Sequence, residues 1–225
     1  MNENYLLFFE KNIEEKIQFF ENLEYSLNIF KEIDEHFNEY NIGSTLDHDE
    51  FNEIQKIYTL ITISEIEISI IFKNLFYSKN KIENIFILKK GILIVIETIN
   101  TLNKFQIMLK SLSIDNDILN KEYQEISLGL KKIKKDFNIE KLKKIRNKTI
   151  AHYDLDFIQF FKLSNEIEFN KYRILLLKFW AFIRFNNIFL NCYLLSDSIS
   201  ENEMKEKFKL QKYKVLRDLK EICVD

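Results

Sequence analysis

Apolar residues recur at three- and four-residue steps along almost the whole chain, which is the period of an α-helix and not of a β-strand. The first run covers residues 3–40, and its apolar positions are Phe9, Ile13, Ile17, Phe20, Leu23, Leu27 and Phe30. Short polar breaks separate the later runs. The pattern predicts further helices over 47–78, 80–113, 115–136, 165–195 and 200–222, with a helical stretch between the fourth of these and residue 145.

Most of these runs begin with a capping-box pattern, in which a short polar residue is followed three residues later by Glu. The pairs are Asp47 with Glu50, Asn80 with Glu83, Asn165 with Glu168, and Ser200 with Glu203. Asp115 is the candidate cap of the run over 115–136. We therefore expect each helix to begin at its polar residue.

Two short segments, 60–63 and 92–96, are rich in β-branched residues and could be read as strands. Both lie inside longer helical patterns without flanking turn residues, so we interpret them as buried helix. Each predicted helix has an apolar face that needs a partner, which favours an all-α, up-and-down bundle of long antiparallel helices. We expect one domain over 1–225, with a core at 47–195 and the helices 3–40 and 200–222 packed on it.

The composition agrees with a soluble globular protein, since 46% of residues are hydrophobic and 30% are charged. The absence of proline and the three glycines favour helices, although a bias toward A and T in the gene produces part of this composition. The most apolar window, 174–195, contains Lys178, Arg184 and three asparagines, which are costly in a lipid bilayer. We predict a buried core helix in a cytoplasmic protein, with no membrane span and with Cys192 and Cys223 reduced.

Basic residues are concentrated in one segment, although the formal net charge of the chain is −2. Residues 131–148 hold nine basic and two acidic side chains, giving +7. The basic residues are Lys131, Lys132, Lys134, Lys135, Lys141, Lys143, Lys144, Arg146 and Lys148. Such a segment attracts a phosphate backbone, or is simply a solvated lysine face.

A candidate motif closes this segment, because Arg146 and Asn147 are followed by His152. RNA carries its own nucleophile, the 2′-hydroxyl, so its cleavage requires proton transfer and stabilisation of phosphate charge. A histidine titrates near neutral pH and suits general acid–base catalysis. An arginine stays charged and can bind two phosphate oxygens. An adjacent asparagine can orient the histidine, the phosphate or the ribose. These residue types predict a catalytic site that uses neither a metal nor a cofactor.

The segment Lys144–Asp154 resembles the motif of the HEPN superfamily, which has an Arg, a polar residue, and a His after four to six further residues. The sequence Arg-Asn-Lys, followed by Ala-His and a nearby Asp, is most similar to the AbiU2-like proteins of bacterial defence and toxin systems. The resemblance implies a HEPN-like helical bundle and an endoribonuclease that acts in phage defence or as a toxin. It also implies a homodimer in which two motifs form one site, with an antitoxin or other defence partner possible.

Further residues near the motif are candidates for RNA binding. Lys143, Lys144 and Lys148 are placed to contact phosphate. Tyr153 could stack on a base, and Asp154 could fix the tautomer of His152. Tyr153 and Asp154 could equally be structural residues.

The spacing of the motif constrains its geometry. On one unbroken helix, the six residues from Arg146 to His152 turn the chain by about 600°, so the two side chains point about 120° apart. They meet only if the helix breaks between them or if a second subunit supplies one of them. The alternative function is a catalytically inactive helical module that binds RNA or a protein.

A weaker polar stripe lies on the run over 165–195. It consists of Arg173, Arg184, Asn187 and Asn191, at near-multiples of a helical turn. Such a stripe contacts a site, contacts a partner subunit, or forms the solvent edge of its helix. We expect the solvent edge, because surface helices keep one polar face.

Overall fold

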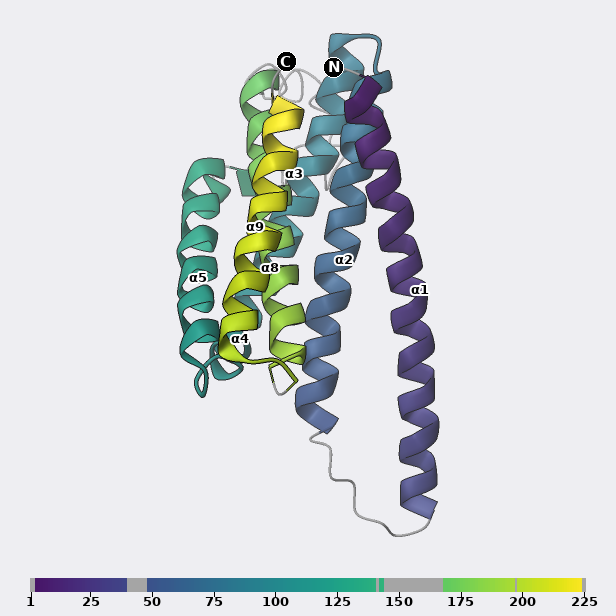
Figure 1. The fold of residues 1–225 in the computed structure, drawn as a ribbon. Helices are drawn as coiled ribbons and strands as arrows, with labels where there is room; N and C mark the ends of the chain where they lie inside the picture. Colours follow the sequence, from purple (N-terminus) through teal and green to yellow (C-terminus); the bar gives the residue numbers. More distant parts are fainter. Residues whose placement is uncertain (1–2, 40–47, 141, 144–167, 197, 224–225) are drawn as a thin grey trace.

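The computed structural model describes residues 3–39, 48–140, 142–143, 168–196 and 198–223. These residues form seven helices and no strand. The helices are α1 (Glu3–Glu39), α2 (His48–Tyr77), α3 (Lys81–Lys104), α4 (Gln106–Ser111), α5 (Asp117–Phe137), α8 (Phe169–Leu194) and α9 (Glu201–Cys223). The long helices run in alternating directions along one bundle axis (Figure 1), so the predicted all-α bundle of antiparallel helices is confirmed.

α8 forms the centre of the bundle and packs against α2, α3, α5 and α9. Its apolar side chains cover nearly the whole circumference of the helix, which explains why this window is so apolar. α8 has the length and hydropathy of a membrane span, and 72% of its most apolar window is buried inside the bundle. The helix predicted to be a buried core element is therefore buried among four others.

α1 and α2 form a long hairpin that extends beyond the other helices at one end (Figure 1). At the opposite end, aromatic rings join α1 to the core. Phe9 stacks on Phe72 of α2, with ring centroids 4.8 Å apart, and lies edge-on to Trp180 of α8 at 5.9 Å. Phe9 and Trp180 are fully buried. The start of α1 is thus part of the hydrophobic core.

Several predicted helix ends are confirmed in atomic detail. Asn80 Oδ1 accepts a hydrogen bond from the backbone N–H of Glu83 at 2.9 Å and caps α3. Ser200 and Glu203 form a reciprocal pair at the start of α9, where the backbone N–H of Ser200 donates to Glu203 Oε2 at 2.8 Å. The β-branched segments 60–63 and 92–96 lie within α2 and α3, as predicted.

Three predicted boundaries were wrong. The run 80–113 is divided at Phe105, where a short turn ends α3 and α4 begins, and neither proline nor glycine marks this point. Asn116, and not Asp115, caps α5, since its Oδ1 accepts from two backbone N–H groups. α8 begins at Phe169 with Glu168 at the cap position, and Asn165, the predicted start, lies outside the described residues.

α3 and α8 approach closely at Gly91. A Cβ atom at this position would lie 2.9 Å from a methyl carbon of Leu176, which is itself fully buried. The missing side chain allows the two helices to pack, so this glycine serves helix packing within the core.

Candidate functional site

The motif residues lie almost entirely outside the described part of the chain. Those not described are Lys144, Arg146, Asn147, Lys148, His152, Tyr153 and Asp154. Lys143 is the exception. It is half-buried, and its Nζ lies 3.1 Å from Glu140 Oε1. The predicted assembly of Arg146 with His152 therefore stays a prediction.

The structure does describe the helix end that precedes the motif. The last two turns of α5 carry a group of lysines on its outer side, opposite the buried Leu130, Ile133 and Phe137. With Lys143 they form what we call the lysine cluster: Lys131, Lys132, Lys134, Lys135 and Lys143. Among the described residues, Lys131, Lys132 and Lys135 form no ion pair and are exposed. The exposed lysines therefore give this surface a concentrated positive charge.

Mutual repulsion within the lysine cluster is visible at Lys134. Its ammonium donates a hydrogen bond to Asn103 Oδ1 of α3, which holds it against the bundle. Partial burial lowers the pKa of Lys134, and the nearby charges of Lys143 and Lys131 lower it further. The neighbouring positive charges therefore add to the effect of burial at Lys134.

α5 ends at Asn138, which adopts a left-handed conformation with φ 48° and caps the helix. Asparagine tolerates this conformation better than other residues that carry a Cβ. Residues 139–140 and 142–143 are again helical, and Ile139 and Leu142 are buried. The chain is thus anchored to the core by Ile139 and Leu142 after the end of α5.

A second polar region lies inside the bundle and was not predicted. Glu65 of α2 is completely buried, and its carboxylate lies between two cations from other helices. Lys16 Nζ of α1 is 3.0 Å from Glu65 Oε2, and Arg184 Nε of α8 is 3.5 Å from Oε1. Arg184 also donates to Asp218 Oδ2 of α9 at 2.9 Å. Four helices are thereby joined by one buried charge network.

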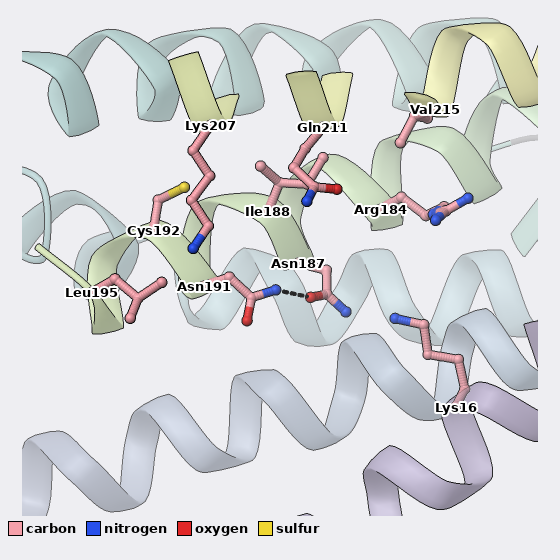
Figure 2. A pocket seen from close by; sticks show the side chains of 10 residues that line it. All are labelled: Lys16, Arg184, Asn187, Ile188, Asn191, Cys192, Leu195, Lys207, Gln211 and Val215. Atoms are coloured by element: carbon pink, nitrogen blue, oxygen red, sulfur yellow. Dashed lines mark hydrogen bonds between the residues drawn. The ribbon is translucent and has the colours of Figure 1, made fainter. Parts of the chain in front are cut away.

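Beside this network, an amide chain crosses from α2 to α8. Tyr58 of α2 donates a hydrogen bond to Asn191 Oδ1, and Asn191 Nδ2 donates to Asn187 Oδ1 at 2.7 Å (Figure 2). Burial raises the pKa of Tyr58, and Cys192 raises it further, so the phenol stays protonated and remains a donor. The chain fixes the orientation of Asn187, whose Nδ2 is left without a hydrogen-bond partner among the described residues.

The interpretation of the α8 stripe as a solvent edge was therefore wrong for two of its members. Arg184 enters the buried charge network, and Asn187 is only 7% exposed. Asn191 is exposed, as expected. Glu65 was missed in the sequence, but the helical period indicates that it is buried. It stands between Ile61 and Ile68 on the buried face of α2. A lone charge at such a position requires a buried partner.

Neither protein-family models, nor curated proteins, nor solved structures match this chain. The HEPN resemblance thus depends on the eleven residues from Lys144 to Asp154. Within the part of the chain that the structure describes, no group of three or more His, Cys, Asp or Glu side chains is arranged to hold a metal ion. Cys192 is buried, and burial raises the pKa of its thiol to about 11.

Proposed function

We propose that this protein is a metal-independent endoribonuclease of the HEPN class, acting in phage defence or as a toxin, with Arg146, Asn147 and His152 in its catalytic site. The observation that carries the proposal is the lysine cluster of α5, which leads directly into the Arg-Asn motif. A basic surface that precedes a candidate catalytic motif in the sequence supplies sequence-independent affinity for a polyanion.

The proposed reaction is an internal transesterification of RNA. The 2′-oxygen of a ribose attacks the adjacent phosphorus while its proton is removed, and the bond from phosphorus to the 5′-oxygen breaks. The leaving 5′-oxygen takes up a proton, so the products are a 2′,3′-cyclic phosphate and a 5′-hydroxyl. His152 transfers protons, and Arg146 stabilises the charge that develops on the phosphate oxygens.

A cleavage assay with matched substrates tests this chemistry. The protein should cut a single-stranded RNA in the presence of EDTA and leave cyclic phosphate ends. It should not cut the same RNA with 2′-deoxyriboses, because that strand lacks the nucleophile. Strong inhibition by EDTA, or cleavage of the deoxy strand, would contradict the proposal.

The active form is proposed to be a homodimer in which Arg146 of one subunit acts with His152 of the other. Arg146→Ala and His152→Ala proteins should each be inactive. Unfolding and refolding them together forms mixed dimers, and each mixed dimer holds one site with both residues intact. Recovery of cleavage after mixing supports the composite site, whereas two inactive proteins that stay inactive would contradict it.

The competing function is a catalytically silent module that binds RNA or a protein. Such a module would retain salt-sensitive RNA binding, but His152→Ala would change neither RNA cleavage nor the growth of cells that express the protein. An assay with the product of the neighbouring gene is part of the test, since a toxin or defence nuclease can depend on an antitoxin or partner. RNA left intact under all these conditions would favour the silent module.

A further inference from the structure

A pocket of about 320 Å³ lies between α1, α8 and α9, and no residue of the lysine cluster lines it. Its polar lining consists of Lys16, Arg184, Asn187, Asn191, Lys207 and Gln211 (Figure 2). Its volume is at the lower end of the range for small-molecule sites. We propose that this pocket binds a small phosphate monoester, through residues other than those of the proposed catalytic motif.

The first argument is the buried donor at Asn187. Its Oδ1 accepts from Asn191, which directs Nδ2 the other way, and Nδ2 is buried with no hydrogen-bond partner among the described residues. Figure 2 shows Nδ2 of Asn187 and the ammonium of Lys16 pointing toward each other from two helices. Lys16 already pairs with Glu65, whereas the amide of Asn187 has no acceptor, and a buried donor of this kind requires one.

The second argument is charge. The two carboxylates of the network, Glu65 and Asp218, are engaged by Lys16 and Arg184. Lys207 of α9 also lines the pocket and forms no ion pair within the described residues. Arg217 adds a further cation at Asp218, so the two carboxylates are fully matched and the charge of Lys207 has no carboxylate of its own. An anion would balance it.

The arrangement of donors favours phosphate over carboxylate. A planar carboxylate is best held by the fork of an arginine, but the fork of Arg184 is committed to Glu65 and Asp218. The donors that remain come from separate helices, namely Asn187 on α8 and Lys207 on α9, and the ammonium of Lys16 lies beside them in its pair with Glu65. A tetrahedral phosphate can accept from several directions at once, and lysines bind it as point charges.

The pocket also has apolar lining residues, namely Ile188, Leu195 and Val215. These side chains form no hydrogen bond with an inorganic ion, but they suit a ring or an alkyl group. The combination of polar and apolar lining therefore indicates an ester of phosphate with a small organic group.

The experiment measures binding of phenyl phosphate by titration calorimetry to the full-length protein carrying His152→Ala, so that the catalytic motif does not contribute. We expect saturable binding, with inorganic phosphate weaker and benzoate weaker still. Lys207→Gln should weaken binding by roughly tenfold or more, the loss expected for one charged contact. Asn187→Asp, which keeps the shape but replaces the donor with a negative oxygen, should abolish it.

Lys209→Gln is the matched control, because it removes the same charge from the same helix at an exposed position outside the pocket. It should bind as well as the parent protein. The melting temperature of each variant is measured alongside, and an unchanged value shows that the bundle is intact. No binding at roughly 10 mM phenyl phosphate, equal binding of benzoate, or no effect of Lys207→Gln would overturn the proposal.

Discussion

Lys16 of α1 and Glu65 of α2 form an ion pair of 3.0 Å in which the carboxylate is completely buried. The pair joins the first half of α1 to the second half of α2 and is extended by Arg184 of α8. Both oxygens of Glu65 lack a well-oriented hydrogen bond among the described residues, so these cations are what compensates its burial. The pair fixes the register of α1 on the bundle.

Removal of the Glu65 carboxylate should strongly destabilise the fold. Glu65→Ala leaves Lys16 without its partner and Arg184 with Asp218 alone, and breaking a buried pair costs about 3–5 kcal/mol. Urea denaturation followed by circular dichroism measures this loss. Glu67→Ala, on an exposed position of the same helix, should change stability by less than about 0.5 kcal/mol. Equal stability of the two variants would show that the network is not structural.

The aromatic contact between α1 and the core predicts a second stability effect. Phe9 is fully buried between Phe72 and Trp180, so Phe9→Ala should cost about 3–5 kcal/mol. Leu7→Ala, two residues earlier and 61% exposed, is the control and should be nearly neutral. Trp180 fluorescence reports the same site, because it is the only tryptophan in the chain. A native-like Phe9→Ala protein of unchanged stability would contradict the packing of α1.

Cys192 should react slowly with thiol reagents in the folded protein. Burial raises the pKa of its thiol to about 11, and only the thiolate is nucleophilic. In a Cys223→Ser background, the alkylation rate should keep rising with pH past 9.0, the ordinary pKa of a cysteine thiol, and level off only near pH 11. Since the thiol is held neutral by the fold, the stability it contributes is present below pH 9 and is lost as the pH rises toward 11. A rate that levels off near pH 9 would contradict this.

The lysine cluster predicts a change in the salt dependence of RNA binding. Lys131→Gln combined with Lys135→Gln should reduce the slope of log affinity against log salt by roughly 0.7 for each lysine that contacts a phosphate of single-stranded RNA. Binding is measured by fluorescence anisotropy at several salt concentrations with the His152→Ala protein. The control is Lys214→Gln with Lys220→Gln, two exposed lysines of α9. Identical slopes in both double variants would show that the cluster contacts no phosphate and is an ordinary solvated surface.

Most helices of the fold could be predicted from the sequence, because apolar periodicity and capping patterns depend on residues that are close along the chain. Asn80 and Ser200 begin their helices as predicted, since a cap involves only neighbours along the chain. The break at Phe105 was not predictable in this way. It has no proline or glycine, so its turn depends on the tertiary packing of α3 and α4.

The internal polar network shows a different limit of sequence reasoning. Glu65 lies on the buried face of α2, and that position alone indicates a partner without identifying it. Lys16 is 49 residues earlier, and Arg184 is on a helix whose polar stripe was read as a solvent edge. Helix packing brings the three side chains together. The residues of the motif, by contrast, were found from the sequence, and their geometry lies outside the described residues.

The most direct test of the central claim is RNA cleavage by purified protein in EDTA, comparing the natural chain with His152→Ala. The account predicts that the natural chain cuts RNA to 2′,3′-cyclic phosphate ends and that His152→Ala, with unchanged circular dichroism and dimerisation, does not. Cleavage by His152→Ala at the rate of the natural chain would contradict the assignment of the motif as the catalytic site.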